Sequence, residues 1–112
     1  VEGNIIEGIV LNLPEIQNAV PASFLVNQNY PNPFNPRTVI EYELPEEGNV
    51  RLEVFSLIGE KVDEIINQKQ NAGGYKIEWN AKGLPSGIYF YKLNFVGISK
   101  NCSVTKKMVY LK

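Results

Sequence analysis

The sequence predicts an all-β protein, an immunoglobulin-like antiparallel β-sandwich of about seven strands, and three observations support this fold. Short apolar segments recur along the 112 residues, and most alternate between apolar and polar positions, which is the pattern of a half-buried strand. Turn residues separate the segments about every eight to twelve positions, as in a sandwich. Gly87 and Tyr89 follow Leu84 at the spacing of a tyrosine corner, in which the tyrosine hydroxyl binds nearby backbone.

Residues 1–22 are predicted to be a linker or the end of a preceding domain, and residues 23–112 a single domain. An apolar stretch at residues 9–13 is compatible with one strand. Residues 20–23, with the sequence Val-Pro-Ala-Ser, have the composition of an extended linker. The chain begins with Val1 and not with methionine, which indicates a fragment or a processed chain.

Residues 28–37 are predicted to form a loop whose shape is largely preset. Pro31, Pro33 and Pro36 each fix their own φ angle and disfavour the helical region for the preceding residue. Residues 33–36 also match the P-x-x-P form that aromatic grooves bind. That pattern is short and common, so a packed structural loop is the favoured interpretation.

A hairpin is predicted after this loop. Residues 38–44 alternate between apolar and polar side chains until Pro45, and Glu-Gly-Asn at residues 47–49 turns the chain. Residues 50–54 alternate in the same way, and Gly59 ends this second strand.

The rest of the chain is predicted to add four strands. Residues 57–70 match both helical and strand spacing, and their position between clear strands favours a strand. Residues 75–79 alternate cleanly. Residues 88–95 are apolar on both faces, as expected of a central strand covered on both sides. A polar turn near residues 97–101 leads into the final strand, residues 103–111.

Composition excludes several classes of function. Eleven basic and twelve acidic side chains are scattered along the chain and leave a net charge of −1, so no nucleic-acid footprint is visible. No apolar stretch approaches the roughly 20 residues of a membrane span. Cys102 is the single cysteine, so no internal disulfide can form.

Catalytic chemistry is also not expected. The chain has no histidine, the commonest general base and metal ligand. Glu41 with Glu43, and Glu46 with Glu47, are expected to face water on a strand and in a turn. We therefore predict no enzyme, no catalytic residue, no cofactor and no metal site.

The aromatic residues and the last lysines each allow two interpretations. The aromatics are expected to fill the core, although a sugar-stacking platform is the alternative; they are Tyr30, Phe34, Tyr42, Trp79, Tyr89 and Tyr91. Lys106, Lys107 and Lys112 either contact an anionic partner or guard the edge of the final strand.

Several motifs occur in a fixed order: Gln-Asn-Tyr-Pro-Asn-Pro-Phe-Asn-Pro at residues 28–36, strands at 38–45 and 50–59, Ala-Gly-Gly-Tyr at 72–75, Leu-Pro-Ser-Gly-Ile-Tyr at 84–89, and Lys-Lys-Met-Val at 106–109. In this order, from about residue 20, the chain resembles the type A C-terminal sorting domain of the type IX (Por) secretion system. The resemblance implies an immunoglobulin-like secretion and anchoring signal, carried by a larger exported enzyme or adhesin and lacking activity of its own.

The resemblance further implies that the outer-membrane translocon recognises the domain after export to the periplasm. A cell-surface sortase then removes the domain and joins the cargo to anionic lipopolysaccharide, so the protein is expected to be secreted or held at the cell surface. Cleavage is expected between about Ala19 and Val26.

By motif position, the expected recognition residues are Asn32, Pro33, Phe34, Gly87, Lys106, Lys107 and Lys112. A proline-fixed loop and an exposed terminal strand have little ordering entropy left to lose, which favours binding. The alternative function is an immunoglobulin-like structural or carbohydrate-binding accessory module of a multidomain hydrolase.

Overall fold

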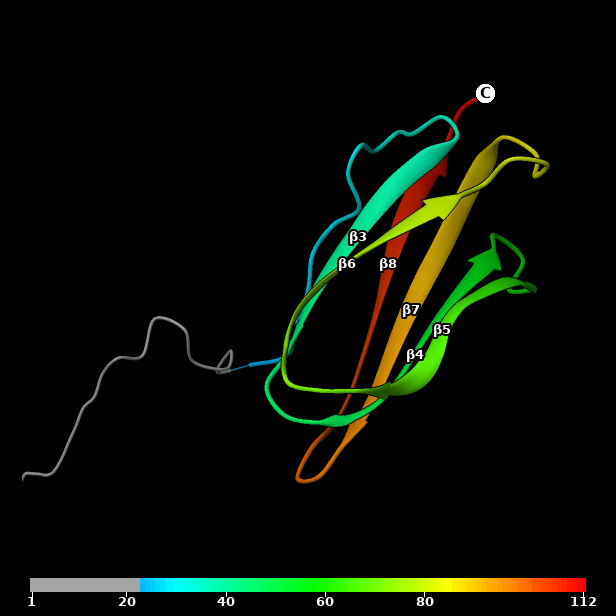
Figure 1. The fold of residues 1–112 in the computed structure, drawn as a ribbon. Helices are drawn as coiled ribbons and strands as arrows, with labels where there is room; N and C mark the ends of the chain where they lie inside the picture. The colour runs from blue at the N-terminus through cyan, green and yellow to red at the C-terminus, as the bar shows by residue number, and fades with distance from the viewer. Residues whose placement is uncertain (1–22) are drawn as a thin grey trace, which may run out of the picture.

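The computed structural model describes residues 23–112 as a sandwich of two antiparallel sheets (Figure 1). The three-stranded sheet has the order β2-β3-β6, formed by β2 (Leu25–Val26), β3 (Arg37–Leu44) and β6 (Gly73–Asn80). The four-stranded sheet has the order β5-β4-β7-β8, formed by β5 (Lys61–Gln70), β4 (Gly48–Ser56), β7 (Gly87–Gly97) and β8 (Asn101–Tyr110). The predicted all-β, immunoglobulin-like sandwich of about seven strands is confirmed. The strand suggested at residues 9–13 lies outside the described residues.

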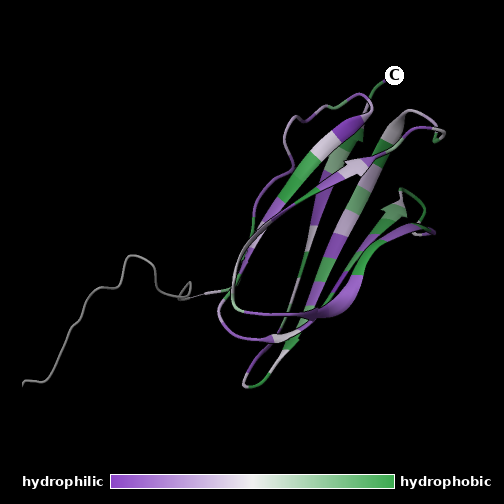
Figure 2. Cartoon of the chain, in the orientation of Figure 1, coloured by the Kyte–Doolittle hydropathy of each residue, from purple (hydrophilic) through white to green (hydrophobic). Residues whose placement is uncertain are grey.

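The core lies between the sheets and is built by the alternation seen in the sequence. On β3, Thr38, Ile40, Tyr42 and Leu44 are buried, and every second residue of β4 and β7 is buried opposite them. Figure 2 shows β7 as bands of hydrophobic and hydrophilic residues. Because each large apolar side chain stabilises the fold by about 1.5–3 kcal/mol when fully buried, this face-to-face contact is the main source of stability.

The predicted hairpin between residues 38–44 and 50–54 is wrong. β3 pairs with β2 and β6, whereas β4 pairs with β5 and β7, so the two segments belong to different sheets. Pro45 has no N–H to continue the ladder of β3, and the short connection that follows carries the chain across the sandwich. Alternation identifies which face of a strand is buried, and it does not identify the neighbouring strand.

The strand predicted at residues 57–70 is confirmed over residues 61–70, whereas residues 57–60 form a turn, and β7 does lie inside its sheet between β4 and β8. The expectation that β7 is covered on both faces is wrong for the described residues. Its outward side chains, such as Ile88 and Phe90, are half-buried, and the opposite sheet covers only the face that carries Tyr91 and Leu93. The sequence reasoning also missed β2, because a strand of two residues has no alternation to detect.

The sandwich has two ends that matter for function. At the proximal end, Leu25 pairs with Glu43, and the ring of Phe24 stacks on Phe95 with centroids 5.8 Å apart, so the described chain enters here. At the distal end lie the loop of residues 28–36, here called the proline loop, the connection from β6 to β7 and the C-terminus (Figure 1). The first and the last described residues therefore lie at opposite ends of the sandwich (Figure 1).

Candidate recognition site at the distal end

The proline loop is attached to the edge of β8 by backbone hydrogen bonds. The Phe34 N–H donates to the Val109 carbonyl at 2.9 Å, and the Leu111 N–H donates to the Phe34 carbonyl at 3.0 Å. Phe34 thereby forms an isolated parallel bridge with Tyr110. The loop therefore adds one residue of strand pairing to the last part of the chain.

Two side chains extend this attachment. The Asn32 Oδ1 atom accepts a hydrogen bond from the Val109 N–H at 2.9 Å, and the Gln28 Nε2 atom donates to the Lys107 carbonyl at 2.7 Å. Both bonds satisfy backbone groups of β8 that face away from β7. The loop and the terminal strand are thus a single surface.

The Phe34 ring is a packing residue. It is only 2% exposed, it stacks on Tyr110 with centroids 5.3 Å apart, and it meets Trp79 edge to face at 5.9 Å. The P-x-x-P segment is thus a packed structural loop, as the sequence favoured. Asn32 and Pro33, which directly precede Phe34, are exposed.

A buried amide fixes the start of the loop, and the sequence analysis did not single it out. The Asn29 Nδ2 group donates to the Pro31 carbonyl at 3.1 Å and to the Thr38 hydroxyl at 2.9 Å. The Tyr91 hydroxyl accepts from the Asn29 N–H at 2.9 Å. Burial raises the pKa of Tyr91 to about 12. In the sequence, this network could have been detected from Thr38, which is a polar residue at a position of a predicted strand that faces the core.

The connection from β6 to β7 completes the distal end. The Tyr89 hydroxyl donates to the Pro85 carbonyl at 2.7 Å, which is the predicted tyrosine corner. Gly87 pairs with Tyr110 and has a φ of 154°, a backbone conformation that favours glycine. The backbone N–H of Lys112 donates to the Ser86 hydroxyl at 2.9 Å, so the corner also holds the last residue.

The three predicted lysines occupy different positions. Lys106 lies on the core-facing side of β8 and is half-buried, whereas Lys107 and Lys112 are exposed. None of them has an ion pair with another residue in 23–112. The structure therefore brings Asn32, Pro33, Phe34, Gly87 and Lys112 together at the distal end, whereas Lys107 and Lys106 lie further back on β8, opposite Phe90 and Tyr91.

The aromatic residues form a core and not a platform. Five of the six are buried, namely Phe34, Tyr42, Trp79, Tyr89 and Tyr91. Tyr30 is the exception, because its side chain is 80% exposed. This arrangement does not favour the alternative of a carbohydrate-binding accessory module.

The carboxylates serve structural contacts. Glu41 pairs with Lys76 at 3.7 Å, and Glu47 pairs with Lys69. Glu46, in the turn expected to face water, accepts exposed hydrogen bonds from the Ser99 hydroxyl and N–H, both at 2.6 Å, and these bonds lower the pKa of Glu46. Within residues 23–112 no group of three His, Cys, Asp or Glu side chains could hold a metal ion, and no helix is long and apolar enough to cross a membrane.

The fold and the distal end define the class of this chain: an all-β module that joins a preceding chain at one end and presents a rigid loop and terminal strand at the other. The family model for the secretion system C-terminal sorting domain matches residues 28–111, and the chain belongs to this family. It is a type IX secretion signal that is itself non-catalytic, that the type IX machinery recognises, and that directs export to the cell surface or the medium.

One similar solved structure is that of dimeric latent PorU from Porphyromonas gingivalis. The match has a TM-score of 0.63 and 17% sequence identity, and it covers 81% of this chain and 10% of that one. At this identity the similarity shows the fold alone. The comparison with curated proteins gives no match.

Proposed function

We propose that the distal end and the adjoining part of β8 are the surface that the type IX translocon recognises, and that Asn32, Pro33, Lys106, Lys107 and Lys112 make the contacts. One observation carries this proposal: segments far apart in the sequence are held together by the bonds from Asn32 and Phe34 to β8 and from Lys112 to Ser86. A surface that is ordered before binding loses little conformational entropy when a partner binds. Phe34 and Gly87 contribute by fixing the backbone.

The charge of this surface supports an acidic partner. Residues 106–112 contain three lysines and no acidic residue. Lys107 and Lys112 are exposed on this surface. Exposed lysines steer an anionic surface into register and raise the rate of association.

The larger protein that carries this domain is an exported enzyme or adhesin, and the catalytic activity of the whole protein, if any, resides in that cargo. A cell-surface sortase removes the domain and joins the cargo to anionic lipopolysaccharide. From Phe24 onward the chain is held by stacking on Phe95 and by pairing with β3. This attachment supports cleavage before Phe24, in the first part of the expected window from Ala19 to Val26.

A reporter fusion tests this function. Residues 1–112 are fused to the C-terminus of a reporter that the Sec pathway exports, and the fusion is expressed in a strain with an active type IX system. The expected product is a cell-surface reporter that ends before Phe24 and carries lipopolysaccharide. A reporter that stays in the periplasm, while an established sorting domain exports the same reporter, would overturn the proposal.

A further inference from the structure

The edge of β8 is open over its first half and closed over its second half. At the distal end, Phe34 binds the Val109 carbonyl and Leu111 N–H, and Gln28 binds the Lys107 carbonyl. In an antiparallel ladder the backbone groups of alternate residues point away from the paired strand. The backbone groups of Val109 and Lys107 point away from β7. The backbone N–H and C=O groups of Thr105, Ser103 and Asn101 therefore point away from β7 as well. No residue in 23–112 pairs with these three along that edge.

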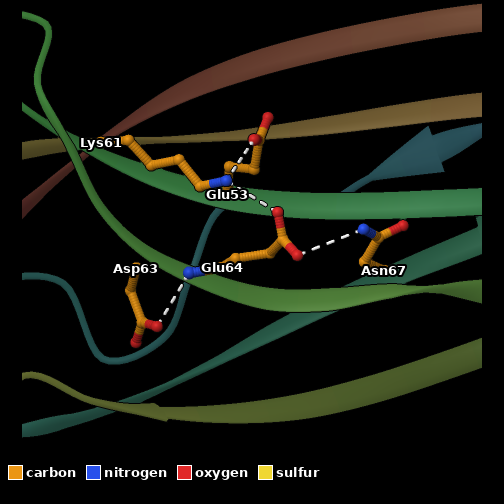
Figure 3. A network of polar contacts seen from close by, with 5 residues as sticks. All are labelled: Glu53, Lys61, Asp63, Glu64 and Asn67. Carbon is orange, nitrogen blue, oxygen red and sulfur yellow. Dashed lines mark hydrogen bonds and ion pairs between the residues drawn. The ribbon is translucent and has the colours of Figure 1, made fainter.

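The other long edges of the sandwich are obstructed. β5 carries a network in which Lys61 contacts Glu53 at 3.0 Å and Glu64 at 2.7 Å (Figure 3). The pairing of β4 with β5 also shifts register twice. Charged side chains and bulges of this kind prevent another strand from pairing.

The edge of β6 lies on the same side as β5. The Trp79 Nε1 group on β6 donates to the Asp63 Oδ2 atom on β5 at 2.8 Å, and the Tyr42 hydroxyl donates to the Gln70 Oε1 atom at 2.6 Å. These contacts tie β5 to the opposite sheet at two points, and the exposed charges of Lys76 and Glu78 on β6 oppose pairing with another strand. The remaining edge strand, β2, has only two residues.

By contrast, the open part of β8 has none of these obstructions. Residues 101–105 have the sequence Asn-Cys-Ser-Val-Thr, without a charge or a proline. β8 pairs with β7 in unbroken register from Val96 with Asn101 to Gly87 with Tyr110. Such a regular, uncharged edge is a template for an added strand.

Lysines stand at both ends of this edge, Lys100 before it and Lys106 and Lys107 after it. A second copy of β8 would add more positive charge at both ends of the pairing, which opposes self-association. A strand with acidic side chains would gain cross-strand charge pairs at the same positions.

We propose that residues Asn101–Thr105 of β8 bind an extended, acidic segment of the secretion machinery by strand addition. This inference rests on recognition of the domain by that machinery, and it names a second site on β8, which adjoins the distal surface at Lys106 and Lys107. Main-chain hydrogen bonds to Ser103 and Thr105 supply the affinity, and the flanking lysines select the acidic partner.

The test uses the reporter fusion to residues 1–112 with changes at Thr105, which is exposed. Thr105→Pro removes the outward N–H while leaving the bonds to β7 in place, because proline is tolerated where the N–H faces solvent. Thr105→Ala is the matched control, since it keeps the N–H. The expected result is about a tenfold loss of surface reporter for Thr105→Pro and no loss for Thr105→Ala. Thermal unfolding of each purified chain verifies folding.

A second pair of variants keeps the test decisive if Thr105→Pro does not fold. Thr105→Glu and Thr105→Lys both retain the backbone, and only the first repels an acidic strand. Export lower for Thr105→Glu than for Thr105→Lys supports the acidic partner, and equal export of the two overturns it. Normal export of a folded Thr105→Pro chain overturns strand addition. Failure of the unmodified fusion to be exported contradicts the proposed function instead, so the two failures are distinguishable.

Discussion

The side-chain oxygen of Asn32 accepts a hydrogen bond from the backbone N–H of Val109, 77 residues further along the chain, at 2.9 Å. The bond joins the proline loop to the edge of the last strand, β8, that faces away from β7. Loop and strand are therefore predicted to form or to be lost together. This relationship makes the distal end a composite surface, and the following predictions test how it is held.

Removal of the Asn32 amide should loosen the end of β8. Asn32→Ala is expected to lower the free energy of unfolding by about 0.5–1.5 kcal/mol, the net value of one hydrogen bond. Amide exchange at Val109 should accelerate more than at residues in the middle of β7. Asn35→Ala, a change of the same chemistry at another exposed asparagine in the loop, serves as the control. Equal stability and equal exchange in the two variants would show that the Asn32 bond contributes nothing.

Phe34 is predicted to act through packing. Phe34→Ala should lower the free energy of unfolding by about 3–5 kcal/mol, because it leaves a cavity between Tyr110 and Trp79. Ile98→Ala, at a large apolar side chain that is 82% exposed, should change it by less than about 0.5 kcal/mol. Urea unfolding measures both. A Phe34→Ala chain with wild-type stability and impaired export would instead make the ring a direct contact.

Two buried tyrosines should make the fold sensitive to alkali. Burial raises the pKa of Tyr42 and of Tyr91 to about 12, from an ordinary value of 10.0. The folded state thus favours the protonated phenols. Their contribution to stability is complete below about pH 10 and is lost as the pH rises through about 12.

The double variant Tyr42→Phe with Tyr91→Phe lacks this component, so its stability should fall less steeply over that pH interval than that of the wild type. Tyr30→Phe, at an exposed tyrosine, should leave the slope unchanged. Urea unfolding at a series of alkaline pH values measures the slopes. Parallel curves for all three chains would be inconsistent with this account.

Glu46 should control the order of the turn between β7 and β8. Its carboxylate accepts bonds from Ser99 and Lys100, and the bond from the Ser99 hydroxyl is the main reason that its pKa is lowered. A lowered pKa in the folded state means that this stabilisation is present above the ordinary pKa of 4.5 and is lost as the pH falls through the lower folded value. Glu46→Ala should accelerate amide exchange at Ser99 and Lys100 at neutral pH. Glu47→Ala is the control, and equal exchange in both variants would refute this role.

The sequence predicts those parts of the structure that depend on one strand at a time. The alternation at Ile40, Tyr42 and Leu44 correctly identifies a buried face, and the spacing of Gly87 and Tyr89 correctly identifies the tyrosine corner. The partner of a strand depends on contacts between distant segments, which alternation does not encode. That is why a hairpin was expected for β3 and β4, although the two strands lie in different sheets.

In the recognition site too, the sequence predicts local features and does not predict contacts between distant segments. The proline spacing predicts a loop of preset shape, and the family resemblance points to the lysines at the end of the chain. That Asn32 caps β8, that Asn29 is buried against Thr38, and that Glu46 anchors a turn around Ser99 all depend on side chains meeting across the fold. A single asparagine or glutamate in a loop gives no local signal of such a partner.

Recognition through the distal end is tested most directly by comparing two pairs of lysine neutralisations in the reporter fusion. Lys107→Gln with Lys112→Gln removes two charges from the proposed surface, and Lys69→Gln with Lys76→Gln removes two charges from exposed ion pairs elsewhere, each worth about 0–1 kcal/mol. Surface reporter should fall about tenfold or more for the first pair and stay near the wild-type level for the second. Equal export of the two fusions, with both chains folded, would contradict the claim that this end of the sandwich is what the secretion machinery recognises.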